Sequence, residues 1–160
     1  MNKLVISTLA LFCLVSVVNA EPKLKWFLAN GNIFSVQAPS SWIKNKKSEY
    51  LSISSPNGNV SITASAYGKG GGSLSEFAKY RFSSVQSFYK PTTKIYKISN
   101  GVVQEYEGIW PNEKKPTYYT VAALKIGSMY MSITFVTDRN NFNKNKKLYM
   151  KILQTIKVNS

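Results

Sequence analysis

The chain has 160 residues, no histidine and one cysteine, and 21 Lys and Arg against seven Asp and Glu give a net charge of +14. Without histidine, Ser-His-Asp and Cys-His catalysis and ordinary zinc sites are excluded. This length fits one domain and leaves no room for a linker. What remains is a binding protein, or an enzyme that works with carboxylates.

Residues 1–20 have the pattern of a secretory signal peptide. A short positive start precedes the apolar run 4–18, which is too short for a comfortable membrane span, and small residues end at Ala20. The only cysteine, Cys13, lacks the small preceding residues of a lipoprotein site. We therefore expect cleavage after Ala20, no stable transmembrane anchor, and one exported domain over 21–160, either periplasmic or secreted.

Charge is the most prominent feature of the composition. Removal of the predicted signal peptide removes one lysine and no acid, so the net charge falls by one to +13. A field of this sign favours anionic partners: lipid head groups, acidic glycans or an acidic protein face. Nucleic acid fits the charge but not an exported protein. The alternative is a compositional bias, because lysine outnumbers arginine 19 to 2.

Four two-residue turn signals divide the mature chain into hairpins. Asn-Gly pairs favour type I′ turns, and Gly-Ser favours type II′. The pairs are Asn30-Gly31, Asn57-Gly58, Asn100-Gly101 and Gly127-Ser128, which predict hairpins at about 25–38, 49–66, 94–110 and 117–137. The second turn pairs Ile53 with Ile62, and the alternation of apolar and polar residues leaves one face of this hairpin exposed to solvent. The fourth hairpin is apolar on both sides, so its strands should be central and covered on both faces.

Two helices are predicted. The first spans 73–90, because Ser73 and Glu76 have the spacing of a capping box and Pro91 stops the helix. Its apolar face comprises Leu74, Phe77, Ala78, Phe82, Val85, Phe88 and Tyr89. The second lies near 144–157, where Tyr149, Ile152, Leu153 and Ile156 recur at helical spacing. Four antiparallel hairpins with two helices indicate an α+β domain whose sheet lies between helical layers.

The segment GNIFSVQAPSSW, ending at Trp42, resembles the "F-x-x-x-x-P-x-x-W" opening of PsbP-like and Mog1-like domains. The helix after the Gly-rich loop, and the tail from Gly127 to Val158, are similar to those families in position. The resemblance implies an α/β/α sandwich and a non-enzymatic binding or assembly-helper role. The metal-binding histidines of some PsbP relatives have no counterpart in this chain.

Two similar clusters combine an aromatic residue with lysines. They are Trp42 with Lys44, Lys46 and Lys47, and Phe142 with Lys144, Lys146 and Lys147. Aromatic rings beside ammonium groups suit anionic surfaces or glycans, provided the rings are exposed. The alternative is a solvated lysine face. Lysines at the start of the second predicted helix would oppose its dipole, and such a conflict of local rules points to function.

Arg81 falls within the apolar face of the first predicted helix. Its guanidinium could hold a carboxylate or phosphate in a cleft. Alternatively, its stem packs on the sheet and its head reaches solvent or a scarce acid.

Glu105 and Glu107 are the only close carboxylate pair, and they lie on one face of a predicted strand. Two carboxylates could serve glycoside or phosphoester hydrolysis or bind a hard cation. The Asn100-Gly101 turn instead predicts ordinary cross-strand pairs, with Lys94 opposite Glu107 and Tyr96 opposite Glu105.

The glycine run before the first predicted helix, 68–72, lacks the ending of a phosphate-binding loop. It could bind an anion at the helix start or serve as a connector. No cofactor or metal site is predicted.

The sequence thus predicts a small exported, non-enzymatic binding protein of the cell envelope. Its partner would be a protein, in an immunity-type or assembly-helper role, or an anionic lipid or glycan. The alternative is an envelope glycan or phosphoester hydrolase using Glu105 and Glu107.

Overall fold

The computed structural model describes residues 21–48, 50–68, 72–109 and 115–159; the predicted signal peptide, 1–20, lies outside them. The elements follow in chain order as β1 (Leu24–Leu28), η1 (Asn30–Asn32), β2 (Phe34–Pro39), β3 (Ile43–Lys44), β4 (Leu51–Ser54), β5 (Val60–Ala66), α1 (Leu74–Gln86), β6 (Lys90–Pro91), β7 (Tyr96–Ile98), β8 (Gly101–Gly108), β9 (Thr117–Ile126), β10 (Met129–Asp138), α2 (Arg139–Gln154) and β11 (Lys157–Val158).

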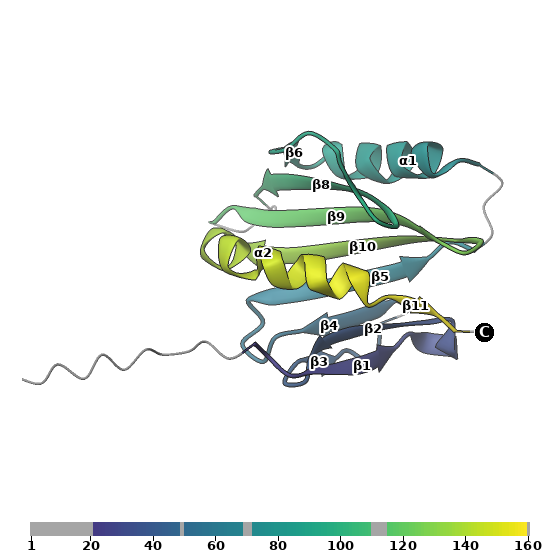
Figure 1. Ribbon diagram of the computed structural model, residues 1–160. Coiled ribbons are helices and arrows are strands. Elements are labelled where there is room, and N and C mark those ends of the chain that lie inside the picture. Colours follow the sequence, from purple (N-terminus) through teal and green to yellow (C-terminus); the bar gives the residue numbers. More distant parts are fainter. Residues whose placement is uncertain (1–20, 49, 69–71, 110–114, 160) are drawn as a thin grey trace, which may run out of the picture.

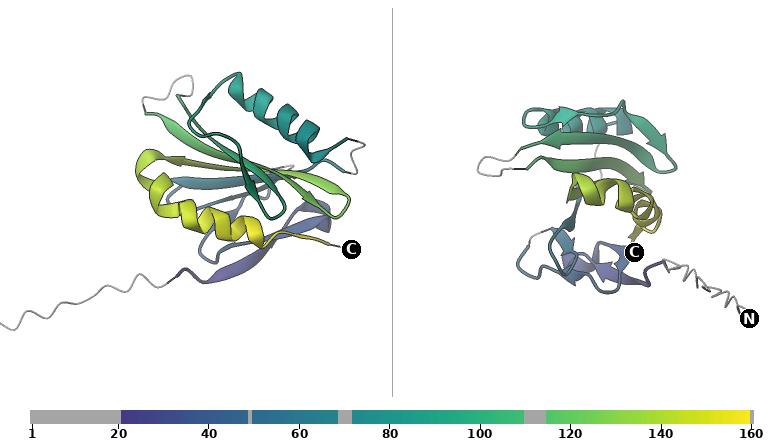
Figure 2. Two further views of the ribbon diagram at one scale, coloured as in Figure 1. Left: turned by 45° about the horizontal axis from the view of Figure 1, so that its top comes forward. Right: turned by 90° about the vertical axis from the view of Figure 1, so that its left-hand side faces the viewer.

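A single large sheet lies between the two helices (Figures 1 and 2). Its strand order is β3-β4-β5-β10-β9-β8-β6, with β7 also paired to β8, and all pairings are antiparallel. Helix α1 packs on one face and α2 on the other. The predicted α+β class and α/β/α sandwich are therefore confirmed.

The first hairpin does not join the large sheet. Strands β1 and β2 form a separate three-stranded sheet with β11, in the order β1-β2-β11. This small sheet shares the α2 side of the molecule (Figure 2). It helps to close the larger core, in which Phe27, Val36 and Ala38 are buried.

The central strands β9 and β10 bury both faces, as predicted from their sequence. On the α2 side lie Ala122, Leu124, Met131, Ile133 and Phe135. On the α1 side lie Tyr119, Val121 and Ala123, under Ala78 and Phe82 of the helix. Alternate residues of a strand point to opposite faces, so one strand contributes to both cores.

The predicted register is correct in the second hairpin, where Ile53 pairs with Ile62 and Leu51 with Ala64. Its turn is not type I′, however, because only Gly58 has a positive φ and Ser55 accepts a hydrogen bond from the Gly58 amide. The first turn also differs, since a 3-10 turn with positive φ at Gly31 and Asn32 replaces the predicted pair. At Gly127 the positive φ agrees with the type II′ prediction.

The register of the third hairpin was predicted wrongly. The turn is Ser99-Asn100, so Tyr96 pairs with Val103 and Ile98 with Gly101. Glu107 lies opposite Lys90 of β6 rather than Lys94. Gly101 is the first residue of strand β8 and does not have a positive φ. A methyl group built there would overlap the backbone carbonyl oxygen of Ala123, so the position needs glycine for close packing rather than for a turn.

Helix α1 begins as predicted and ends early. The Ser73 hydroxyl accepts from the Glu76 amide at 3.2 Å, and the Ser73 amide donates to the Glu76 carboxylate at 2.6 Å, which completes the capping box. The helix stops at Gln86, four residues before Lys90. Phe88 therefore leaves the predicted apolar face and is exposed.

Helix α2 begins earlier than predicted. Asp138 is its N-cap and accepts from the Asn141 amide at 2.9 Å. Lys144, Lys146 and Lys147 consequently lie within the helix, not at its first turn, and the predicted conflict with the helix dipole does not occur. Among the described residues, neither helix has the length and apolar character required to cross a membrane.

The Asp138 cap gives a pH-dependent prediction. Hydrogen bonds from the Asn141 amide lower the pKa of Asp138 below its ordinary value. Its stabilisation is therefore fully present above that ordinary value and is lost as the pH falls through the lower folded-state pKa. Asp138→Ala should cost about 1 kcal/mol at neutral pH.

Urea unfolding at neutral pH and near pH 3 checks this expectation. Asp138→Asn is the matched variant, because it retains a capping oxygen without the titration. A destabilisation by Asp138→Ala that is no smaller in acid would contradict an ionised cap.

Candidate functional site

The two aromatic rings of the predicted lysine clusters are not available to a partner. Trp42 is 6% exposed and Phe142 is 9% exposed, and both belong to the larger core. The Phe142 ring packs on Tyr118 with 5.5 Å between ring centroids. The expectation of an aromatic patch beside the lysines is therefore wrong. Both rings point inward because they lie on the core-facing sides of their segments.

The lysines of the two clusters separate into different environments. Lys44 donates to the Leu28 carbonyl at 2.6 Å, while Lys46 and Lys47 are exposed. Lys146 forms an ion pair with Glu105 at 2.7 Å. Lys144 and Lys147 line a groove that none of the first cluster reaches.

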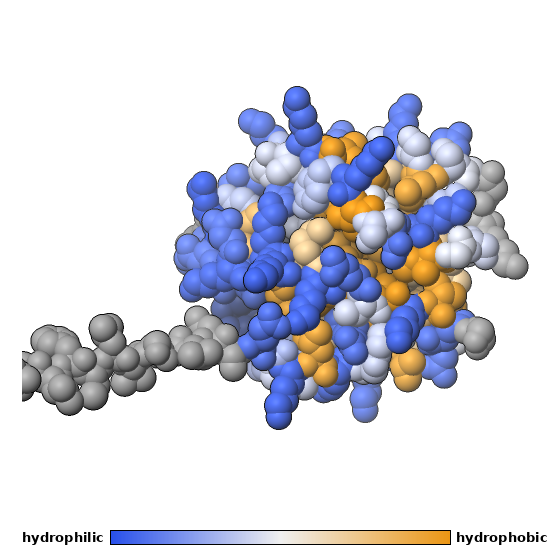
Figure 3. Space-filling model, in the orientation of Figure 1, coloured by the Kyte–Doolittle hydropathy of each residue, from blue (hydrophilic) through white to orange (hydrophobic). Residues whose placement is uncertain are grey.

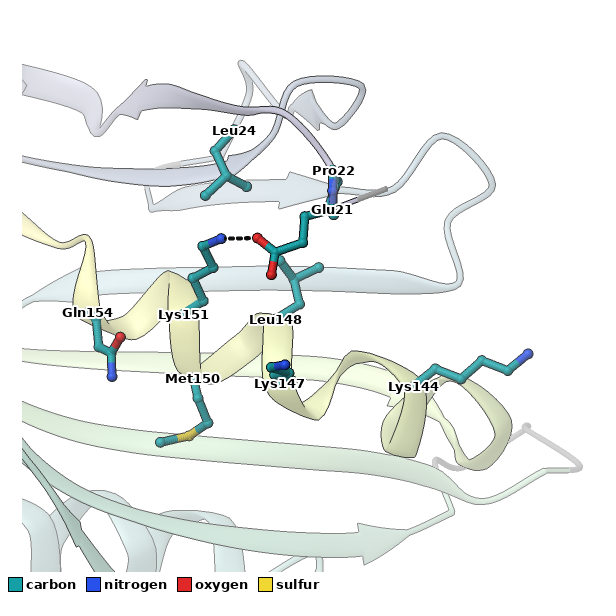
Figure 4. Close-up of a pocket in the computed structure, with 9 residues that line it drawn as sticks. All are labelled: Glu21, Pro22, Leu24, Lys144, Lys147, Leu148, Met150, Lys151 and Gln154. Atoms are coloured by element: carbon teal, nitrogen blue, oxygen red, sulfur yellow. Dashed lines mark hydrogen bonds and ion pairs between the residues drawn. The ribbon is translucent and has the colours of Figure 1, made fainter. Parts of the chain in front are cut away.

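This groove, which we call the α2 groove, runs between helix α2 and the start of β1 and has a volume of about 670 Å³ (Figure 4). It is lined by Glu21, Pro22 and Leu24 on one side and by Lys144, Lys147, Leu148, Met150, Lys151 and Gln154 of α2 on the other. Figure 4 shows Lys151 and Glu21 pointing toward each other below Leu24, whereas Lys144 extends away. The groove is a mainly apolar hollow with ammonium groups along the helix.

A carboxylate of the chain itself lies among these lysines. Lys151 donates to the Glu21 carboxylate at 2.5 Å, and both side chains remain partly or largely exposed. The pKa of Glu21 is lowered, first by the hydrogen bond and charge of Lys151 and further by Lys147. The groove thus presents a positive potential in which an anionic group is favoured.

Lys151 and Glu21 were not among the residues selected from sequence. A signal was available for the lysines, because Lys144, Lys147 and Lys151 have the i, i+3, i+7 spacing of one helix face. No sequence signal places Glu21 beside them, since 130 positions separate it from Lys151.

A second hollow lies at the start of α1, and we call it the α1 pocket. It is lined by Tyr67, Gly72, Ser73, Phe77, Tyr80 and Tyr130 and has a volume of about 250 Å³. The Phe77 ring contacts both Tyr67 and Tyr130 at 5.2 Å between centroids. Tyr130 is fixed by donating to the Gly72 carbonyl at 2.5 Å, while Tyr67 and Tyr80 leave much of their surface exposed.

Arg81 lies beside this pocket, half-buried on α1. Its guanidinium carbon is 5.2 Å from the Tyr67 ring centroid, a cation–π arrangement. Within the part of the chain that the structure describes, Arg81 makes no ion pair and its buried Nε has no hydrogen-bond partner. Partial burial raises the pKa of Tyr67, and the Arg81 charge acts in the opposite direction. A buried N–H group without a hydrogen-bond partner is costly in free energy. The Arg81 Nε–H group would therefore be stabilised by a hydrogen-bond acceptor from a binding partner.

Glu105 and Glu107 are held by neighbouring side chains. Glu105 is buried, accepts from the Tyr96 hydroxyl at 3.0 Å and pairs with Lys146. Glu107 accepts from the Tyr118 hydroxyl at 2.7 Å. Burial, and then the Glu105 charge, raise the pKa of Tyr96, while the bond to Glu107 raises that of Tyr118. Neither carboxylate lines the α2 groove or the α1 pocket.

Among the described residues, no group of three or more Cys, Asp or Glu side chains could hold a metal ion. The glycine run 68–72, for which the sequence leaves anion binding or a connector open, lies largely outside those residues, because the structure describes Gly68 and Gly72 but not 69–71. On the face that carries α2, hydrophilic side chains surround several separate hydrophobic patches (Figure 3).

Comparison with solved structures decides the fold. Mog1p, the Ran-binding protein of Saccharomyces cerevisiae, superposes with a TM-score of 0.61 at 11% identity, covering 86% of this chain and 96% of that one. PsbP (CyanoP) of Synechocystis superposes with a TM-score of 0.54 at 11% identity, covering 85% and 92%. The chain has the PsbP/Mog1-like fold.

This fold also occurs within a longer protein. A crystal structure from Bacteroides thetaiotaomicron has a TM-score of 0.61 and 16% identity, and the match covers 85% of this chain. The chain spans about half the length of that structure, 48%. No family model and no curated protein matches the sequence.

Proposed function

We propose that this chain is a non-enzymatic binding protein of the cell envelope, which docks on another protein through the α1 pocket. The observation that carries the proposal is Arg81. Its guanidinium stacks on an exposed tyrosine beside an aromatic hollow, and its buried Nε lacks a hydrogen-bond partner among the described residues. Within this class, an immunity-type or assembly-helper role is the proposed one.

The composition of the pocket supports protein docking. Tyr, Trp and Arg dominate the few residues that carry most of the energy of protein interfaces, and they cluster in pockets that exclude water. Tyr67, Tyr80 and Arg81 provide this combination on neighbouring elements. The volume of about 250 Å³ is below that of typical small-molecule sites, so it suits one anchoring side chain of a partner. An acceptor next to that anchor would bind Arg81.

The comparisons support the class of function. Mog1p, which has this fold, is named as a Ran-binding protein. One fold can carry different binding surfaces, so a shared fold is compatible with a different protein partner.

The positive charge would act as a long-range field rather than as specific contacts. Exposed lysines such as Lys46 and Lys47 contribute roughly 0–1 kcal/mol each and are screened over about 8 Å at physiological salt. Such a field speeds encounter with an acidic partner face. An exported location is proposed on the signal-like pattern of residues 1–20 alone.

Site-specific photo-crosslinking in living cells tests the docking surface. A benzophenone amino acid in place of Tyr80 should give one discrete protein adduct, identifiable by mass spectrometry. The matched control is the same amino acid in place of Phe88, an exposed aromatic residue beyond the other end of α1. Arg81→Met should reduce the adduct at least tenfold, since truncation of an interface anchor typically costs about 2 kcal/mol or more.

The same variant separates docking from folding. Arg81→Met should change the free energy of unfolding by no more than about 1–2 kcal/mol, because an apolar side chain often replaces a partly buried charge at little cost. Equal adducts from positions 80 and 88, or an adduct that survives Arg81→Met, would sink the proposal.

A further inference from the structure

The α2 groove combines two chemistries that the α1 pocket does not. Lys147 and Lys151 line the helix side of the groove near the Glu21 carboxylate, and Lys151 is paired with it. Next to that ion pair are the apolar side chains of Leu24 and Leu148 (Figure 4). A volume of about 670 Å³ lies within the range of small-molecule sites.

The ion pair shows that the Lys151 ammonium binds a carboxylate at this position, with the Lys147 charge acting in the same direction. The Glu21 side chain is 70% exposed and that of Lys151 is 49% exposed. Exposed ion pairs are weak and screened by salt. A carboxylate from another molecule could therefore replace Glu21 at little cost.

An apolar track continues from the groove along β1. Leu24, Trp26 and Leu28 alternate along the strand and so point to one face. Trp26 and Leu28 are both exposed, and the Lys157 ammonium lies 4.5 Å from the centroid of the Trp26 ring. The whole strip is thus apolar along its length and positive at its flank.

We propose that the α2 groove binds a long-chain carboxylate, of the fatty acid class. Its head would take the place of the Glu21 carboxylate between Lys147 and Lys151. Its tail would lie against Pro22, Leu24 and Leu148 and extend toward Trp26. This proposal does not rest on protein docking at the α1 pocket, because the two hollows share no residue.

Calorimetric titration of the purified protein with dodecanoate, below its micelle concentration, tests the proposal. One molecule should bind, and octanoate should bind far more weakly, since each buried methylene contributes about three- to fourfold in affinity. Dodecyltrimethylammonium has the same tail with a cationic head and should not bind.

Three variants assign the site. Lys151→Gln should weaken dodecanoate binding about tenfold, as expected for a lost charged hydrogen bond. Glu21→Gln should strengthen binding several-fold, because the competing carboxylate is gone. Lys79→Gln, an exposed lysine on α1, is the matched control and should leave binding unchanged.

Three results would overturn the proposal. In the first, the cationic amphiphile binds as tightly as dodecanoate. In the second, Lys151→Gln and Glu21→Gln both bind dodecanoate like the unaltered chain. In the third, a hexaglutamate peptide binds in a Lys151-dependent manner while dodecanoate does not, which would assign the groove to an acidic peptide.

Discussion

Phe82→Ala should destabilise the protein by about 3–5 kcal/mol, the range for removal of a buried phenylalanine. Phe82 is 2% exposed and packs with Tyr106, Val121 and Ala123 between α1 and the large sheet. This is the smaller of the two cores, and Phe82 is its only buried phenylalanine among the described residues. Urea unfolding monitored by circular dichroism measures the change.

Phe88→Ala is the matched control for Phe82→Ala. Phe88 is 78% exposed beyond the end of α1, so its loss should change stability by less than about 0.5 kcal/mol. The sequence places both rings on one helical face. Equal destabilisation by the two variants would mean that α1 continues past Gln86 and buries both.

Gly101→Ala should destabilise the protein by about 3 kcal/mol, the upper part of the usual range for overpacking. The added methyl group would overlap the Ala123 carbonyl oxygen, which is backbone and cannot rotate away. Relief would require β8 and β9 to move apart where their pairing begins, at Gly101 and Leu124. Thermal and urea unfolding both report the loss.

Gly58→Ala separates this effect from the ordinary role of a turn glycine. Gly58 has a φ of +72° with open space around it, so alanine there is strained by the backbone alone and should cost about 1 kcal/mol. If Gly101→Ala destabilises the protein no more than Gly58→Ala does, strands β8 and β9 move apart without a cost in stability, which would contradict the prediction.

The sequence predicted correctly those features that depend only on residues close together in the chain. The Ser73–Glu76 capping box depends on residues three apart and is present as predicted. The alternation around Ile53 and Ile62 fixed the register of its hairpin, because a slip by one residue would expose the apolar set. At Gly101 the same reasoning failed, since a close approach to Ala123 across the sheet cannot be read from an Asn-Gly pair.

The candidate sites were less predictable than the fold. Arg81 was identified as unusual because an isolated charge interrupts an apolar helix face, and the structure places it beside aromatic side chains. The contact between Arg81 and Tyr67 joins residues from different parts of the chain, so no short sequence pattern predicts it. The α2 groove depends on the approach of Glu21 to Lys151, which only the complete fold creates. The position of Trp42 next to exposed lysines in the sequence suggested an exposed ring, but the ring is buried.

The small sheet β1-β2-β11 has a consequence for the order of assembly. Strand β2 lies between its hairpin partner and β11, so Phe34 pairs with Val158. The first hairpin is synthesised before the rest of this domain, yet the other strand that pairs with β2 follows more than a hundred residues later. Contacts of such long separation form late because the intervening chain must first be ordered. A nascent polypeptide cannot complete this sheet before residue 158 is made. The larger core therefore closes only when nearly the whole domain has been synthesised.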